Sequence, residues 1–271
     1  MSREDNIKIF TDTLNKIERS TILTEAVKKS NEGQVIITDV KSLPKITYNV
    51  YPDAVKVIVS KSGSFDAARK YNNVAVLNFA SATNPGGGVT KGSTAQEECL
   101  CRCSTLYRNL TDPKAIKEFY EPHKNGLGVL HNDDIIYTPG VVIIKSDANT
   151  SLFRNHNVNV ITCAAPNLRE TPANAYNHES GEGVKISDED LLKLHEQRAY
   201  AILEVARYYK NEHVILGAFG CGAFRNKPEV VAQAYKNILH EFNHSFKTIE
   251  FAVFCRKEDT TNYDTFKRIL G

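Results

Sequence analysis

Two adjacent glutamates, Glu97 and Glu98, follow a run of three glycines, Gly86, Gly87 and Gly88. Carboxyl groups can donate and accept protons, and successive glycines let the backbone approach a ligand closely and adopt positive φ angles. The N–H groups of such a loop can also form a nest for an anion. These residue types, at this spacing, suggest proton transfer beside a bound anionic group.

The glycine loop leaves an apolar, strand-like run, Val74–Phe79, and leads into a helix. Ser93 and Gln96 have the spacing of a capping box, which places the start of this helix near Ser93. Neighbouring helical residues diverge by about 100°, so Glu97 and Glu98 cannot flank one sugar ring as the two carboxylates of most glycosidases do. The two carboxylates are therefore expected to have different roles, in which one donates and accepts protons and the other binds substrate hydroxyls. Acidic residues also favour the first turn of any helix, so the pair alone does not decide between site and helix terminus.

A second glycine-rich loop within Leu216–Glu229 has the same layout, an apolar strand followed by glycines and then a helix. Its glycines are Gly217, Gly220 and Gly222. Asn226 and Glu229 are placed to cap the helix that follows. Two such loops could hold a diphosphate from both sides, whereas two ordinary strand-to-helix turns would give the same pattern.

The first glycine loop carries no familiar nucleotide-binding motif. A P-loop needs Gly-Lys-Ser/Thr after four spacer residues, but here Lys91 precedes Gly92. The G-x-G-x-x-G pattern of dinucleotide-binding domains is absent from Gly86–Gly92. The sequence therefore disfavours a generic nucleotide-binding enzyme.

Strand-like and helical segments alternate along the chain. Strands are predicted for Val35–Thr38, Lys56–Ser60, Val74–Phe79, Ile135–Lys145 (as two strands around a turn at Pro139-Gly140), Val158–Cys163, Val214–Ala218 and Thr248–Phe254. Helices are predicted for Ser64–Tyr71, Ser93–Leu110, Ser187–Tyr209, Pro228–Phe242 and Thr260–Leu270. One or two further helices are expected over 4–30, and a long surface loop over 167–186. The strands that begin near 74 and 214 are almost continuously apolar, which is typical of a layered α/β fold with both sheet faces covered. We expect a single domain over 1–271, with 1–33 as a helical extension.

The amino-acid composition of the chain excludes several classes of protein. The chain of 271 residues has 41% hydrophobic and 24% charged residues and a formal net charge of +2. These values exclude a disordered chain, a collagen-like fibre and a small disulfide scaffold. The small net charge predicts no broad electrostatic attraction to nucleic acid or membranes, and no apolar run reaches the roughly 18 residues of a membrane helix. The charged N-terminus, MSREDNIKIF, lacks the apolar stretch of a signal peptide, so a cytoplasmic location is expected.

The cysteines give no zinc-binding pattern. The chain has 6 of them, and no two form a Cys-x-x-Cys pair. Within the CLCRC run, Cys99, Cys101 and Cys103, residues two apart on a helix would point to different faces. We therefore expect thiols in a reducing compartment rather than metal ligands.

The glycine run, a spacer of seven residues and then Gln96-Glu97-Glu98 resemble the signature of poly(ADP-ribose) glycohydrolases. The surrounding VLNFASATNPGGG and the later LGAFGCGAFRNKP are similar to the microbial-type branch of that family. The resemblance runs from about residue 10 to the C-terminus. It implies a three-layer α/β/α, macrodomain-like fold with a mixed sheet, which binds ADP-ribose.

The resemblance also implies residue roles. Glu98 corresponds to the catalytic glutamate, Glu97 to its partner on the ribose hydroxyls, and Gln96 to a residue that helps to position the ligand. The other implied substrate contacts are Asn78, Ser81, Gly86, Gly87, Gly88, Gly220, Cys221, Gly222, Ala223, Phe224 and Phe254. Phe224 would pack on the ribose next to the scissile bond, although an apolar ring there could equally belong to the core. Phe254 would lie near the adenine. The stretch Lys61–Ala68, which includes Gly63, departs from the more acidic stretch expected in relatives on the adenine side of the site.

The implied activity is hydrolysis of the ribose–ribose O-glycosidic bonds of poly(ADP-ribose), with one glutamate as general acid and base and with no metal or cofactor. The expected partners are poly(ADP-ribose) or an ADP-ribosylated substrate, with no membrane and no sequence-specific nucleic acid. Two alternatives remain at this point, a hydrolase of other ADP-ribosyl adducts and a non-catalytic ADP-ribose reader. The intact Gln96-Glu97-Glu98 disfavours the reader, which needs no acid.

Overall fold

A mixed sheet of seven strands forms the centre of the computed structural model, which describes residues 2–44, 48, 50–126, 128–173 and 182–271. The strands are β1 (Val35–Ile37), β2 (Lys56–Ser60), β3 (Val74–Ala80), β4 (Ile135–Lys145), β5 (Ser151–Ala164), β6 (His213–Leu216) and β7 (Thr248–Ala252). Their order in the sheet is β1-β4-β5-β3-β6-β7-β2. β4 runs antiparallel to β1 and β5, and the remaining neighbours pair in parallel.

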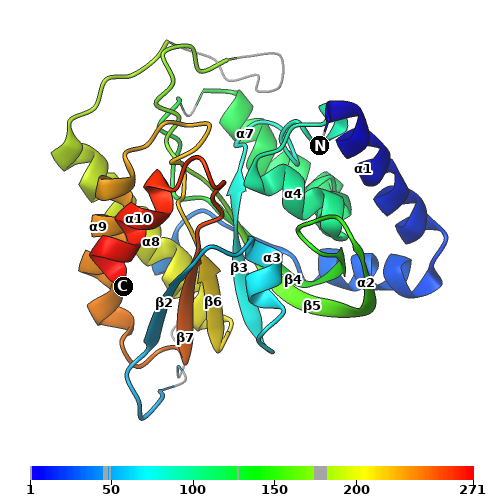
Figure 1. Ribbon diagram of the computed structural model, residues 1–271, viewed down its shortest axis with the longest axis horizontal. Coiled ribbons are helices and arrows are strands. Elements are labelled where there is room, and N and C mark those ends of the chain that lie inside the picture. The colour runs from blue at the N-terminus through cyan, green and yellow to red at the C-terminus, as the bar shows by residue number, and fades with distance from the viewer. Residues whose placement is uncertain (1, 45–47, 49, 127, 174–181) are drawn as a thin grey trace.

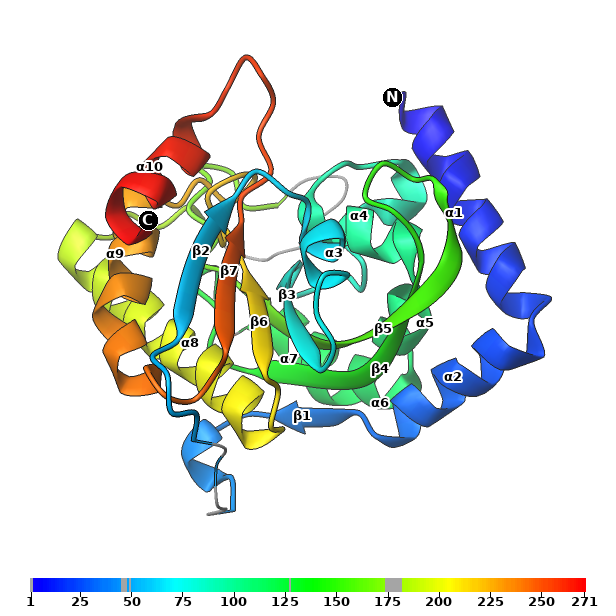
Figure 2. The same ribbon diagram turned by 60° about the horizontal axis from the view of Figure 1, so that its bottom comes forward.

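Helices cover both faces of the sheet (Figure 1). They are α1 (Arg3–Glu18), α2 (Thr21–Glu32), α3 (Ser64–Ala68), α4 (Gln96–Cys103), α5 (Leu106–Leu110), α6 (Pro113–Ala115), α7 (Glu121–Lys124), α8 (Asp188–Tyr208), α9 (Pro228–Ile238) and α10 (Thr261–Leu270). Figure 2 shows α8, α9 and α10 on one side of the sheet and α3, α4 and α5 on the other. The predicted three-layer architecture with N-terminal helices is therefore confirmed. Among the described residues, no helix combines the length and the apolar character needed to cross a membrane.

The central strand β3 explains the apolar run that predicted a doubly covered sheet. Ala75 and Leu77 belong to the core cluster that includes α8 and α9, whereas Val74 and Val76 belong to the cluster that includes α4 and α5. Because side chains alternate between the two faces of a strand, a strand buried on both sides needs apolar residues at every position. β3 therefore joins the two cores and carries the first glycine loop at its carboxyl end.

The helix predicted over Ser93–Leu110 is two helices. α4 begins at Gln96 and ends at Cys103, and the extended Ser104 forms an isolated antiparallel bridge with Ile143 of β4 before α5 begins. The predicted capping box is also wrong, because the N-cap of α4 is Ala95 and makes no side-chain hydrogen bond. Nothing in the local apolar spacing marks this break, because it depends on contact with a distant strand.

Other differences concern irregular segments. The turn predicted at Pro139-Gly140 is instead a bulge within β4, where the register with β5 shifts. The short helices α6 and α7, together with a π turn at Ile116–Tyr120, were not predicted. Of the loop predicted over 167–186, residues 174–181 lie outside the described residues, and the rest contains no helix or strand.

The N-terminal extension supports the first glycine loop. Asn6 on α1 donates a side-chain hydrogen bond of 3.0 Å to the carbonyl oxygen of Gly92, at the end of that loop. Gly92 has a φ of +75°, and a Cβ there would lie 2.3 Å from the carbonyl oxygen of Arg3. At the middle of α1, the Nζ of Lys145 donates to Thr13 Oγ1 at 2.6 Å and to the Ile9 carbonyl oxygen at 2.8 Å. The helix is therefore fixed both to the loop and to the sheet.

Lys145→Met should destabilise the protein because it removes the buried ammonium group and keeps the apolar stem. The Lys145 side chain is only 3% exposed and forms an ion pair of 2.9 Å with Asp12 on α1. Hydrogen bonds to charged groups contribute about 1.5–3 kcal/mol, so the free energy of unfolding measured by urea denaturation should fall by about that amount. Lys28→Met on α2 is the control, because Lys28 is 68% exposed and its loss should change stability by less than about 0.5 kcal/mol. Equal effects of the two changes would show that Lys145 does not anchor α1.

Candidate active site

A cleft of about 720 Å³ opens where β3, β6 and β7 end. The crevice outside the carboxyl ends of the strands is where open α/β sheets commonly bind ligands. The predicted site residues that line it are Ser81, Gly87, Gly88, Gln96, Glu97, Glu98, Gly220, Gly222, Ala223, Phe224 and Phe254. The fold thus brings both glycine loops and the glutamate pair to one cavity.

Three predicted site residues do not line the cleft. Asn78 is fully buried and donates a hydrogen bond of 3.3 Å to Glu97, so it lies behind the carboxylate. Gly86 has a φ of +70° and lies against Tyr107, because a Cβ there would be 2.8 Å from that ring. Cys221 packs against the core cluster beneath α8 and α9, and burial raises the pKa of its thiol.

Glu98 presents one carboxyl oxygen to the glycine loop and leaves the other without a partner. Its Oε1 accepts a hydrogen bond of 2.9 Å from the backbone N–H of Gly88. Its Oε2 is buried and has no hydrogen-bond partner among the described residues. Burial raises the pKa of Glu98, while the Gly88 hydrogen bond and the charge of Arg102 oppose that shift. The carboxyl group is therefore held at one oxygen and is biased by burial towards its neutral form.

Glu97 is held at both oxygens. Its Oε2 accepts from the backbone N–H of Ser81 at 2.8 Å, and its Oε1 accepts from the side-chain amide of Asn78 at 3.3 Å. Burial, followed by the nearby charge of Glu98, raises the pKa of Glu97. Two buried neighbouring carboxyl groups resist double ionisation, so the pair favours sharing a proton.

The close approach of the glycine loop to these carboxyl groups requires glycine at position 87. Gly87 has a φ of +57°, and a Cβ there would lie 2.6 Å from Glu98 Oε1 and 3.1 Å from Glu97 Oε2. Any side chain would therefore enter the space of both carboxyl groups. The loop and the glutamate pair form one packed unit.

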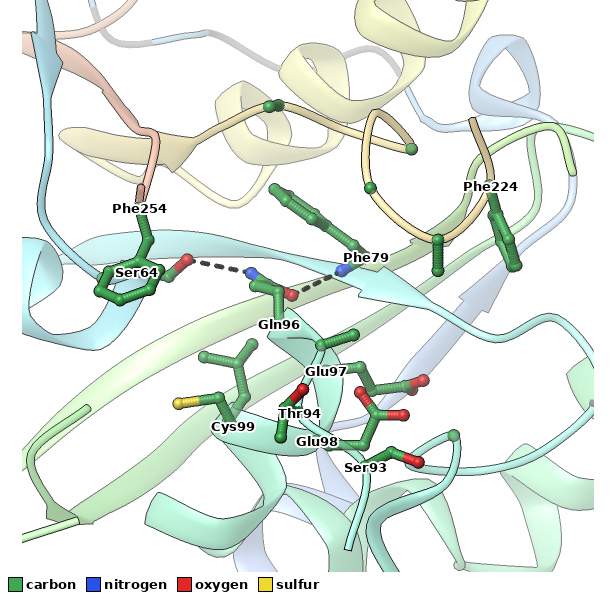
Figure 3. A pocket seen from close by; sticks show the side chains of 18 of the residues that line it. Ser64, Phe79, Ser93, Thr94, Gln96, Glu97, Glu98, Cys99, Phe224 and Phe254 are labelled. Carbon is green, nitrogen blue, oxygen red and sulfur yellow. Dashed lines mark hydrogen bonds between the residues drawn. The ribbon is translucent and has the colours of Figure 1, made fainter. Parts of the chain in front are cut away.

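Gln96 fixes the start of α4 to the end of β3. Its Oε1 accepts from the backbone N–H of Phe79 at 2.9 Å, and its Nε2 donates to Ser64 Oγ at 3.0 Å (Figure 3). The same Nε2 also donates to Leu77 O at 2.7 Å. Both amide hydrogens are thus used within the protein. Gln96 lines the cleft, but its hydrogen bonds serve to position the two glutamates that follow it.

The second glycine loop is organised by Asn226. Its Nδ2 donates to Pro166 O at 2.7 Å and to Gly220 O at 3.1 Å, and its Oδ1 is 2.8 Å from Nε2 of His195. The prediction that Asn226 caps the following helix is wrong, since the N-cap of α9 is Lys227. Gly220, with a φ of +76°, leaves no room for a Cβ beside this amide, which would be 2.6 Å away. Burial lowers the pKa of His195 to about 4 and keeps its ring neutral.

The two aromatic residues assigned to the ligand lie at opposite ends of the cleft. Figure 3 shows Phe254 on one side of Gln96 and Phe224 on the other side, beyond the carboxyl groups of Glu97 and Glu98. Phe254 is 70% exposed. Phe224 is half-buried and touches the edge of the core while it lines the cleft, so it combines the two roles that the sequence left open.

Several cleft residues were not predicted as site residues. They include Phe79, Arg102, Asp147, Arg169, Arg256 and Asn262. Arg102 could have been found, because it lies four residues after Glu98 and so shares its helix face. Asp147, Arg169 and Arg256 lie in connections between elements and reach the cleft only through tertiary structure, so no local pattern marks them. The arginines bring positive charge to a cleft that the glutamates make acidic.

Comparison with known proteins identifies the family. The family described as the microbial-type PARG catalytic domain matches residues 5–146, just over half of the chain. The chain belongs to this family. None of the curated proteins matches it significantly.

Solved structures of bacterial poly(ADP-ribose) glycohydrolases match nearly the whole chain. The protein from Thermomonospora curvata matches with a TM-score of 0.85 at 27% sequence identity, covering 98% of this chain and 100% of that one. The same protein bound to the inhibitor ADP-HPD matches with a TM-score of 0.82 at 27% identity, covering 98% and 99%. The protein from Deinococcus radiodurans in complex with ADP-ribose matches with a TM-score of 0.76 at 31% identity, covering 89% and 96%. The macrodomain-like fold implied by the resemblance is thereby confirmed.

Gly87→Ala should destabilise the protein more than the same substitution at Gly128, where the backbone has a similar φ but no atom lies close enough to clash with the added Cβ. Gly128 has a φ of +73°, and a Cβ there would meet no atom within 4 Å, so Gly128→Ala tests the backbone strain alone. That strain is worth about 1–3 kcal/mol, and forced overpacking adds about 1–3 kcal/mol at Gly87. Urea denaturation of both variants measures the difference. Equal losses of stability would mean that the carboxyl groups are not packed against the loop.

Proposed function

We propose that this protein hydrolyses the ribose–ribose O-glycosidic bonds of poly(ADP-ribose) and releases ADP-ribose. The observation that carries the proposal is the pair of buried glutamates that line a cleft bordered by two glycine loops, of which Glu98 has one buried carboxyl oxygen without a hydrogen-bond partner among the described residues. Membership of the microbial-type family and the matches to bacterial poly(ADP-ribose) glycohydrolases support the same activity.

The two aromatic residues on opposite sides of the cleft suit an extended ligand with an aromatic base at one end and a ribose at the other. We place the adenine near Phe254 and the terminal ribose near Phe224 and the glutamates. The diphosphate would then lie between them, against the backbone of Gly220 and Gly222. Arg169 also lines the cleft and would supply positive charge to the phosphates.

In the proposed reaction, protonated Glu98 donates its proton from Oε2 to the leaving ribose oxygen. The glycosidic bond breaks, and positive charge develops on the ring oxygen and anomeric carbon of the ADP-ribose unit. The Glu98 carboxylate, still held at Oε1 by Gly88, then takes a proton from the water that attacks the anomeric carbon. The proton count returns to its starting value when the alcohol and ADP-ribose leave.

Glu97 has the complementary role of a fixed acceptor. The hydrogen bonds from Ser81 and Asn78 limit its rotation and favour its ionised form, although burial and Glu98 together raise its pKa to about 8. The proposed reaction therefore requires the shared proton to lie on Glu98 when the substrate is bound. A carboxylate held in this way can accept hydrogen bonds from ribose hydroxyls. Its negative charge also stabilises the positive charge that develops on the sugar.

Glu98→Gln should abolish most of the hydrolysis of defined-length poly(ADP-ribose) while the protein still binds ADP-ribose. The amide keeps the shape of the side chain but cannot deliver the proton, and general acid–base catalysis contributes roughly 10²–10⁴-fold to the rate. Released ADP-ribose is quantified by chromatography, and ADP-ribose affinity is measured by calorimetry. Glu25→Gln, on the exposed face of α2, is the control and should keep the wild-type rate.

A mono-ADP-ribosylated protein is assayed in parallel to identify the substrate class. Release of ADP-ribose from the polymer by the wild type, with loss in Glu98→Gln, supports the proposal. Turnover of the mono-ADP-ribosylated protein alone would replace it with hydrolysis of another adduct. Tight ADP-ribose binding without turnover of either substrate would make the protein a reader.

Phe224→Ala should reduce the rate more than it reduces stability. The ring is half-buried at the edge of the core, so its loss should cost less than the 3–5 kcal/mol typical of a core Phe→Ala change. Loss of the ring would still let the ribose move relative to Glu98, and small displacements can lower a rate by about 10²-fold. Phe246→Ala, at a fully buried position, gives the core reference for stability. If Phe224→Ala loses as much stability as Phe246→Ala and keeps its specific activity, Phe224 has a core role only.

A further inference from the structure

A second cluster of chemically reactive side chains lies at the other end of the cleft from Phe224. Cys99 and Cys103 are four residues apart on α4 and therefore share one helix face. Asp147, in the connection between β4 and β5, meets them there, and ligand atoms of the three side chains all lie within 4.8 Å of one another. The sequence argument against a metal concerned residues two apart and does not apply to this pair.

We propose that Cys99, Cys103 and Asp147 bind a divalent metal ion of the zinc type. Two thiolates and one carboxylate form a donor set that suits zinc, whereas magnesium and calcium prefer oxygen ligands throughout. Tetrahedral bonds of about 2.3 Å to sulfur place ligand atoms about 3.8 Å apart, so the three side chains need to close by only about 1 Å. The fourth position is then available to water, as in other sites with three protein ligands.

Neighbouring groups orient the carboxylate of Asp147 as a metal ligand would need to be oriented. Its Oδ2 accepts a hydrogen bond of 2.9 Å from the backbone N–H of Asp66, while its Oδ1 lies 3.8 Å from the Cys99 sulfur. One oxygen is thus oriented by the protein and the other faces the thiol, which is the arrangement that outer-shell hydrogen bonds give to metal-binding carboxylates. Gly63 leaves space for this side chain, because a Cβ there would lie 2.1 Å from Asp147 Oδ2.

The cluster also has an entry path and balancing charge. Cys99 and Asp147 both line the cleft, so an ion can reach them from solvent, while Cys103 is buried behind them. The hydrogen bond with Cys99 and burial raise the pKa of the Cys103 thiol, so the ion has to displace its proton, while the positive charges of Arg102 and Lys145 favour the thiolate. Figure 3 shows the Cys99 thiol pointing away from the carboxyl groups of Glu97 and Glu98. The ion would therefore lie apart from the proposed acid, and its binding does not depend on the proposed hydrolysis.

Cobalt(II) gives a direct test because its spectrum reports thiolate ligands and tetrahedral geometry. The full-length protein, kept reduced with a phosphine, is titrated with Co²⁺, and the thiolate-to-cobalt charge-transfer bands and visible d–d bands are recorded. We expect saturation at one Co²⁺ per chain and loss of the bands when Zn²⁺ is added. Cys99→Ser should weaken Co²⁺ binding by more than about 100-fold, since changes to outer-shell partners alone cost 10–100-fold.

Cys255→Ser is the matched control, because Cys255 is also a partly exposed free thiol but lies outside the cluster. It should bind Co²⁺ as the wild type does. Asp147→Asn tests the third ligand while keeping an acceptor for the Asp66 N–H, and a thermal melt of each variant verifies folding. The proposal is overturned if the reduced wild type shows no thiolate bands, if folded Cys99→Ser keeps its affinity, or if folded Asp147→Asn does so.

Discussion

The buried contact between the Glu97–Glu98 pair and the triple-glycine loop is the constraint on which the site depends. Two carboxyl groups that are both removed from water would repel each other if both were ionised, and burial raises the pKa of each. The loop stabilises them with a backbone hydrogen bond from Gly88 and can do so only because Gly87 has no side chain. The same contact leaves Glu98 Oε2 buried and without a hydrogen-bond partner among the described residues, on a side chain that lines the cleft.

The rest of the fold keeps that contact in place. β3 is buried on both faces and delivers the loop, while the side chain of Gln96 ties the first turn of α4 to the last residues of the strand. α1 closes the far end of the loop at Gly92 and is itself fixed to the sheet by Lys145. Strand, loop and helix are therefore positioned relative to one another mainly by hydrogen bonds to backbone groups.

The sequence predicts those features that depend on neighbouring residues. The exact bounds of β2, the alternation of elements and the start of α8 beside Ser187 follow from periodicity and local hydrogen bonding. The glycine loops could also be assigned to one site, because both follow parallel strands. The features that the sequence did not predict depend on distant partners. Ser104 ends α4 by pairing with β4, Asn226 joins two loops instead of capping a helix, and Asp147 reaches the cleft from a hairpin.

A crystal structure with ADP-ribose bound tests the central claim most directly. The account predicts that the terminal ribose lies beside the triple-glycine loop, with Glu98 Oε2 within about 2.6–3.2 Å of the oxygen on its anomeric carbon. Glu98 Oε1 should remain on the Gly88 N–H, and Glu97 should keep its hydrogen bonds to Ser81 and Asn78. A terminal ribose at the Phe254 end of the cleft, or a Glu98 carboxyl group turned away from the sugar, would contradict the account.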